Sequence, residues 1–193
     1  ESQQLGYETD WKEAGIAGSD SVQNAVHQGK LFWAWGDTNV PEYPLGLFHM
    51  TGARTSLTPL RSFEPPVRLS LDYFAAADGN PRSICTMEGP GPTWLSGCVS
   101  LPDQSGTNRL VGCYLKIRPP LDCYRAGLAV WNEDEEQFTH HSSVWEETED
   151  LPKKPEKLPE GNVVLWTDAE EKEWALFGDP FPNLKCPATF EGW

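Results

Sequence analysis

The stretch Thr93-Trp-Leu-Ser-Gly-Cys-Val-Ser-Leu101 is followed by the polar turn Pro102-Asp-Gln-Ser-Gly-Thr-Asn108 and by Arg109-Leu-Val-Gly-Cys-Tyr-Leu-Lys-Ile117. The two flanking runs carry β-branched and aromatic residues, which suit strands, and the segment between them carries the residues that form tight turns. This pattern predicts an antiparallel β-hairpin. Two more strands are predicted after it, Gly127–Trp131 and, beyond an acidic turn, Glu136–His140.

The same order of short strand, polar turn and aromatic-rich strand occurs twice more along the chain. The two further copies are 20–26 with 31–37, and 162–166 with 173–179. A four-stranded antiparallel meander that recurs after several tens of residues is typical of β-propeller blades. The sequence therefore predicts an all-β fold made of antiparallel four-stranded propeller blades.

The predicted blades divide the chain at its Gly- and Pro-rich segments. We expect residues 1–17 to lead into a single propeller-like domain over 18–193. Within it we expect blade one at 18–87, blade two at 88–144, an exposed connection at 145–160 and the start of blade three at 161–193. Complete propellers have about four to eight blades, so about two and a half blades form an incomplete ring. The remaining blades would come from the rest of a longer chain or from self-association, and a self-standing sandwich is the third alternative.

The composition narrows the class of protein. Of the 193 residues, 38% are hydrophobic and 23% are charged, as in a globular domain. The formal net charge of −14 repels phosphate backbones, so no nucleic-acid partner is expected. No run approaches the roughly 18–20 apolar residues of a spanning helix, which predicts no membrane insertion. The start of the chain lacks the pattern of a signal peptide, so the protein is either cytoplasmic or has had its signal peptide removed.

The five cysteines show no CxxC pair and no histidine at metal-ligand spacing, which predicts no metal site of the zinc type. We expect most of them to be buried core residues. If the protein is exported, one disulfide bond between two of them remains an alternative. No cofactor is predicted, although a structural Ca²⁺ stays open. The cysteines are Cys85, Cys98, Cys113, Cys123 and Cys186.

Gly18-Ser-Asp20 together with Gly29-Lys-Leu-Phe-Trp-Ala-Trp-Gly-Asp-Thr38 resembles the opening blade of five-bladed β-propellers of the glycoside-hydrolase type. That superfamily includes arabinanases, β-xylosidases and fructosidases. A group of uncharacterised exported proteins from environmental bacteria is similar in four further segments, 91–97, 114–118, 177–182 and 187–189. The resemblance implies a carbohydrate-active protein with an oligo- or polysaccharide partner. It also implies an extracellular or periplasmic location after removal of a signal peptide.

Glycoside hydrolysis uses two carboxyl groups, of which one acts as base or nucleophile and the other protonates the leaving group. The resemblance implies Asp20, which opens the innermost strand of blade one, as the base. Turn chemistry, with the carboxylate bonded to backbone N–H groups, is the alternative for this residue. Glu88, in Met87-Glu-Gly-Pro90, is the candidate acid, although in the resembling enzymes the acid normally enters from blade three.

Asp37, in Gly36-Asp-Thr38, is the third catalytic candidate. Asp179, in Gly178-Asp-Pro180, repeats its position in the third set of strands. Recurrence at equivalent places favours a structural role for both residues, in which each carboxylate bonds the backbone of the following turn.

Four further residues are candidates for substrate binding. Trp35 and Trp94 would stack on a sugar ring, with core packing as the alternative. His49 would donate a hydrogen bond to the substrate, or would be a half-buried structural histidine. Arg54 would bind a carboxylated sugar, or would pair with neighbouring acids. The alternative to an enzyme is a non-catalytic carbohydrate-binding or protein-interaction propeller module, and convergence of Asp20, Glu88 and a third carboxyl in one pocket would favour the enzyme.

Overall fold

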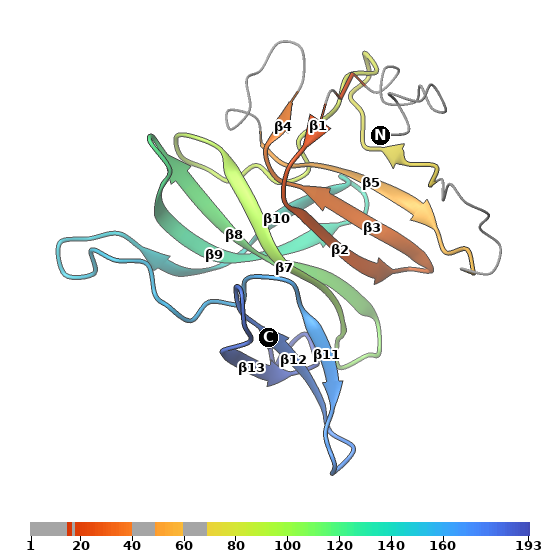
Figure 1. The fold of residues 1–193 in the computed structure, drawn as a ribbon, viewed down its shortest axis with the longest axis vertical. Helices are drawn as coiled ribbons and strands as arrows, with labels where there is room; N and C mark the ends of the chain where they lie inside the picture. Colours follow the sequence, from red (N-terminus) through yellow and green to blue (C-terminus); the bar gives the residue numbers. More distant parts are fainter. Residues whose placement is uncertain (1–14, 17, 40–48, 60–68) are drawn as a thin grey trace.

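The computed structural model describes residues 15, 16, 18–39, 49–59 and 69–193. Within these ranges every regular element is a β-strand, all strand pairs are antiparallel, and no sheet closes on itself (Figure 1). The prediction of an all-β, antiparallel fold is therefore confirmed. None of the described segments forms a helix of the length and hydrophobicity that crossing a membrane requires.

Sheet one comes from the first copy of the repeated pattern. Its strands are β2 (Val22–His27), β3 (Lys30–Trp35), β5 (Thr51–Ser56) and β6 (Asp72–Tyr73), and they are neighbours in that order. The turn between β2 and β3 is two residues long, and both Gln28 and Gly29 have positive φ, at 48° and 72°. This backbone twist is the one that joins two antiparallel strands most tightly. A short ribbon of β1 (Gly18–Ser19) and β4 (Thr38–Asn39) extends beside this sheet.

Sheet two comes from the stretch on which the fold was predicted. It contains β7 (Thr93–Pro102), β8 (Asn108–Arg118), β9 (Asp122–Asn132) and β10 (Gln137–Glu146), again in chain order. Sheet three contains β11 (Val164–Thr167), β12 (Glu173–Phe177) and β13 (Leu184–Pro187). All three predicted hairpins are confirmed, and β10 continues two residues past the boundary expected at 144.

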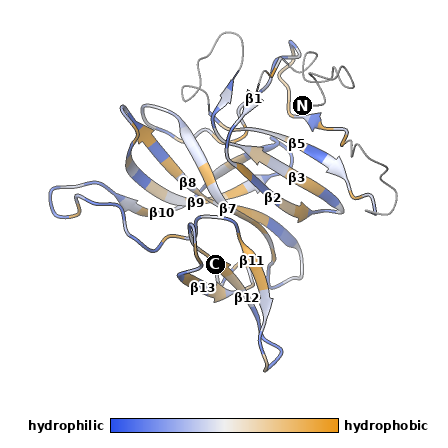
Figure 2. Cartoon of the chain, viewed as in Figure 1, coloured by the Kyte–Doolittle hydropathy of each residue, from blue (hydrophilic) through white to orange (hydrophobic). Residues whose placement is uncertain are grey.

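The three sheets stack in chain order, with sheet two in the middle (Figure 1). Between sheets one and two, the Phe32 ring lies with its centroid 4.8 Å from that of Trp131 and 5.9 Å from that of Phe138. Between sheets two and three, Leu101 of β7 packs in one buried cluster with Phe177 of β12. The strands carry these apolar side chains in alternation with polar ones, as the mixed colours along each strand in Figure 2 show. Face-to-face burial of apolar side chains therefore holds the stack together.

The first strand of each stacked sheet, namely β2, β7 or β11, is also an edge strand of that sheet. At a bulge in β7, the segment that leads into β11 comes close. The Gly97 N–H donates to Gly161 O at 3.0 Å, and Ser96 Oγ accepts from the Gly161 N–H at 2.8 Å. Gly97 has a φ of 63°, and a Cβ there would lie 1.9 Å from Pro159 O. The close backbone approach therefore needs glycine at this position. The consequence is that all three edge strands begin in one region.

The cysteines of the chain are all free thiols, and Cys85, Cys98 and Cys113 are fully buried in the apolar clusters. The prediction that most cysteines serve as core residues is confirmed. Burial raises the pKa of the Cys98 and Cys113 thiols to about 12. These groups therefore pack as small apolar side chains, and reactive thiolates do not form at neutral pH.

Candidate functional site

A pocket of about 680 Å³ lies where the three edge strands begin. Its walls come from the start of β2, the turn between β3 and β4, the start of β7, the segment that enters β11, and the turn after β12. A volume of this size falls within the range of roughly 300–1,000 Å³ that small-molecule sites occupy. The pocket is therefore the candidate functional site of the described chain.

Asp37 enters the pocket from the turn between β3 and β4. Two backbone bonds of 3.0 Å fix this turn, from the Gly36 N–H to Ser21 O and from the Asp20 N–H to Asp37 O. Its Oδ1 is buried and has no hydrogen-bond partner. Burial, and then the charge of Asp20, raise the pKa of the Asp37 carboxyl above its usual value. A carboxyl with a raised pKa gives up a proton less readily, as a general acid requires.

Asp20 lies beside this wall and is exposed to solvent. Its Oδ1 accepts hydrogen bonds from the Ser21 backbone N–H at 2.6 Å and from the Ser21 hydroxyl at 3.4 Å. The turn chemistry set out as the alternative for Asp20 is therefore present. The role of this residue as a catalytic base stays a prediction.

Asp179 reaches the same pocket from sheet three, in the turn that follows β12. The turn is fixed by Gly178, whose N–H donates to Glu160 O at 2.8 Å and where a Cβ would lie 2.1 Å from Phe181 O. The carboxylates of Asp37 and Asp179 form no hydrogen bond or ion pair with any residue of the described chain. The backbone bonds that a structural turn role requires are therefore missing at both positions.

Trp94 and Glu160 also line the pocket, together with the neutral polar residues Ser21, Gln23, Ser96 and Asn162. Trp94 is half-buried against the core of sheets one and two, and its Nε1 is buried without a hydrogen-bond acceptor. Both oxygens of Glu160 accept from Lys154 Nζ, at 2.7 and 2.8 Å. The pocket thus offers an aromatic wall, one neutralised carboxylate and two carboxylates that have no cation.

The other predicted catalytic acid, Glu88, does not join this group. It is exposed, it lies outside the pocket walls, and its backbone oxygen accepts from Arg125 Nη1 at 3.1 Å. Trp35 also lies outside the pocket, because alternation along β3 directs it away from the buried Ala34 side of the sheet. Its ring stacks on Trp33, with centroids 6.0 Å apart and planes at 1°.

His49 holds the start of β7 in place. Its Nδ1 accepts a hydrogen bond from the Thr93 backbone N–H at 3.0 Å. Burial, and then the nearby Lys116, lower the pKa of the imidazole. The ring is thus neutral at neutral pH, and the structural alternative for this residue agrees with its contacts.

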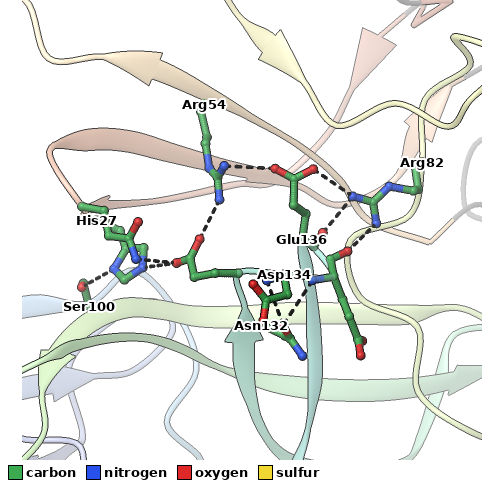
Figure 3. A network of polar contacts seen from close by, with 10 residues as sticks. His27, Arg54, Arg82, Ser100, Asn132, Asp134 and Glu136 are labelled. Carbon is green, nitrogen blue, oxygen red and sulfur yellow. Dashed lines mark hydrogen bonds and ion pairs between the residues drawn. The ribbon is translucent and has the colours of Figure 1, made fainter.

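Arg54 joins sheet one to the turn between β9 and β10 (Figure 3). Its Nη2 lies 3.0 Å from Glu133 Oε2 and its Nη1 lies 3.1 Å from Glu136 Oε1. Oε1 of the same Glu133 accepts a hydrogen bond from His27 Nε2 at 2.7 Å, and His27 Nδ1 bonds Ser100 Oγ at 2.8 Å. The simpler expectation, that Arg54 pairs with neighbouring acids, is confirmed. This network lies between sheets one and two and away from the pocket walls.

Sequence reasoning missed that Glu160 and Asp179 belong to the site. The matching dipeptides Gly36-Asp37 and Gly178-Asp179 carried the signal, because residues at equivalent places in stacked sheets meet at the same end of the stack. In the described part of the chain no group of three or more His, Cys, Asp or Glu side chains could hold a metal ion. A structural Ca²⁺ stays a prediction.

No protein-family model matches the chain, and no curated protein matches it either. Function is therefore inferred from the pocket and its residues.

Proposed function

We propose that the three stacked sheets are consecutive blades of an incomplete β-propeller and that the pocket binds a saccharide. The blade assignment is supported by the position of β2, β7 and β11, each of which is the first and an edge strand of its sheet and begins at the same pocket. In a propeller the innermost strands of the blades surround the central axis in this way. Further blades would come from the rest of a longer chain or from self-association.

One observation carries the saccharide site: Asp37 and Asp179 line the same pocket and neither carboxylate has a partner. Asp37 Oδ1 is buried, and buried polar groups are normally hydrogen-bonded, so an unpartnered one at a cavity wall favours a ligand that supplies the missing bond. Sugar hydroxyls are such donors. The aromatic face of Trp94 offers an apolar wall beside them, against which the C–H face of a sugar ring can pack.

The same two carboxyls support hydrolysis of a glycosidic bond. Asp37, with its raised pKa, would give its proton to the glycosidic oxygen as the bond from that oxygen to the anomeric carbon breaks. Asp179 would take a proton from the water that attacks the anomeric carbon. Asp37 loses one proton and Asp179 gains one, so the total number of protons on the two carboxyls is unchanged. The products are two saccharides with free hydroxyl groups. Asp20, whose charge already acts on Asp37, is the alternative base.

The test is hydrolysis of a panel of neutral oligosaccharides, followed through newly formed reducing ends. We expect Asp37→Asn and Asp179→Asn each to lower kcat by about 10² or more, since general acid–base groups contribute that much. Trp94→Ala should weaken binding, whereas Trp94→Phe should retain part of it. Asp134→Asn, an exposed change in the turn between β9 and β10, is the matched control. Activity that survives both pocket substitutions would overturn the enzyme assignment.

A non-catalytic carbohydrate-binding module is the second candidate, and the position of Glu88 outside the pocket favours it. In that case the wild-type chain binds oligosaccharides without turnover. Isothermal titration of the Trp94→Ala and Asp37→Asn variants, combined with the assay for reducing ends, separates the two candidates. For a binding module, oligosaccharide binding depends on these residues and no reducing ends appear.

A further inference from the structure

The charge of the pocket walls restricts which saccharides can occupy the proposed site. The walls carry three carboxylates, Asp37, Glu160 and Asp179, and no Lys, Arg or His is among the residues that line the pocket. Lys154, which is not among the residues that line the pocket, pairs with Glu160 through both carboxylate oxygens. Asp37 and Asp179 are left without a compensating cation among the described residues.

The unpartnered charged groups in the pocket are acceptors, and the Gln23 and Asn162 amides on its walls are neutral groups that both donate and accept. Asp37 Oδ1 is removed from solvent and receives no hydrogen bond, and the Asp179 carboxylate receives none. Ionised carboxylates accept hydrogen bonds and donate none, and they favour charged donors over neutral ones. The buried Trp94 Nε1–H is a neutral donor and is a weaker partner for an anion than a charged donor would be.

An acidic sugar would meet strong opposition in this pocket. Its carboxylate would lie among like charges, and repulsion is greatest beside Asp37 Oδ1, which is removed from solvent. The net charge of −14 adds a long-range repulsion of anions and an attraction of cations. An ammonium group, in contrast, supplies three charged donors to acceptors that lack partners.

We infer that the pocket selects saccharides that carry a protonated amino group, such as oligomers of glucosamine, over neutral and acidic ones. This inference rests on the proposed function, namely that the pocket holds a saccharide, and it adds the charge class of the sugar. The ammonium would pair with the carboxylate of Asp179, to which Asp37 adds a second charge when it is ionised, while a ring face packs on Trp94.

The experiment compares three β-1,4- or α-1,4-linked oligomers of equal length by isothermal titration at low salt: glucosamine, N-acetylglucosamine and galacturonate. We expect the glucosamine oligomer to bind about tenfold more tightly than its acetylated counterpart, since two partly exposed ion pairs contribute roughly that factor. The galacturonate oligomer should not bind measurably. The preference should shrink as salt rises, and it should disappear as the pH rises through the pKa of the sugar amine.

A matched pair of double variants separates the pocket from the acidic surface as a whole. Asp37→Asn with Asp179→Asn should abolish the preference for glucosamine. Asp134→Asn with Glu170→Gln removes the same two charges from exposed turns outside the pocket walls and should leave the preference intact.

Each outcome decides between the inference and the function on which it rests. Equal binding of the glucosamine and N-acetylglucosamine oligomers, with both dependent on Trp94, would overturn the charge preference and leave the saccharide site standing. Tighter binding of galacturonate would also overturn the preference. Absence of any binding that depends on the pocket residues would overturn both.

Discussion

Asp37 and Asp179 line one pocket although they belong to the first and the third sheet of the stack. Each follows the second strand of its sheet and a glycine, and each carboxylate is without a partner among the described residues. Burial, and then the charge of Asp20, disfavour the charged form of Asp37 and raise its pKa, so this unpaired acid reduces stability. Residues that reduce stability in this way are typical of functional sites, where the protein binds a ligand at some cost to its fold.

The first prediction concerns the stability cost of Asp37. Because the pKa of this carboxyl is raised in the folded chain, the folded state holds the proton more tightly than the unfolded state does. Stability therefore falls as pH rises through the pKa of the folded state. Asp37→Asn should raise the melting temperature at pH 7 by about 1–2 °C and should have less effect near pH 3. A lower melting temperature at pH 7 would contradict this account.

Asp103 gives the opposite expectation for the same substitution. Its Oδ1 accepts from the Ser105 and Thr107 backbone N–H groups at 2.9 and 3.0 Å, and Arg109 Nε lies 3.0 Å from Oδ2. These contacts, led by the bond from the Ser105 hydroxyl, lower the pKa of Asp103 to about 2. Asp103→Asn should lower the melting temperature at pH 7. The loss should vanish as pH falls from about 4 toward 2, because the stabilisation is present above the unfolded pKa and is lost through the folded one.

Lys116 is fully buried and has neutral partners in place of a carboxylate. Its Nζ donates to Met87 O at 3.1 Å, to Gly91 O at 2.7 Å and to Thr93 Oγ1 at 3.2 Å. Lys116→Met should lower the free energy of unfolding by about 2 kcal/mol, since the carbonyl groups lose their donor. Urea denaturation measures the change. Lys172→Met, in the exposed turn before β12, should change stability by no more than about 0.5 kcal/mol.

The pH dependence of Lys116 has a definite sign. Burial, and then the charge of Arg125, lower the pKa of its ammonium in the folded chain. The unfolded chain therefore holds this proton more tightly, so the contribution of Lys116 to stability rises as pH rises from the folded toward the unfolded pKa. This part of the alkaline stability profile should be missing in Lys116→Met, and an unchanged profile would contradict the assignment.

The bulge at Gly97 should be essential to the pocket. A Cβ there would overlap Pro159 O, and the φ of 63° is strained for any other residue. Gly97→Ala should lower stability by about 3 kcal/mol or more and should weaken ligand binding, because the segment that carries Glu160 must move. Gly106→Ala is the control, since Gly106 also has a positive φ, 80°, but a Cβ would meet no atom within 4 Å. Its cost should be about 1 kcal/mol, without an effect on binding.

The arrangement of strands could be read from local sequence because it depends on local chemistry. The alternation of β-branched and aromatic residues, and turns such as Gln28-Gly29, decide which residues are strands and which strands are paired. Arg54 and the buried cysteines followed from equally general expectations about ion pairs and core residues. Trp166, in the predicted strand 162–166, is 58% exposed on the edge strand β11, so aromatic character alone does not predict burial.

The membership of the pocket could not be read in the same way. Glu88 was chosen for its neighbours in sequence, yet its exposed position follows from the path of the loop before β7. A structural role in a turn was favoured for Asp179, yet its carboxylate bonds none of the described residues and the residue lines the pocket. In both cases the outcome depended on how separate sheets meet, and residue type alone carries no information about that.

The sequence by itself therefore determined an acidic, all-β chain of antiparallel meanders, since strand and turn preferences act over a few neighbouring residues. Only the tertiary structure decided that Asp37, Trp94 and Asp179 share a pocket. The reason is physical: the stacking of the sheets depends on the burial of apolar faces and on one close backbone contact at Gly97, and both join residues far apart in the chain.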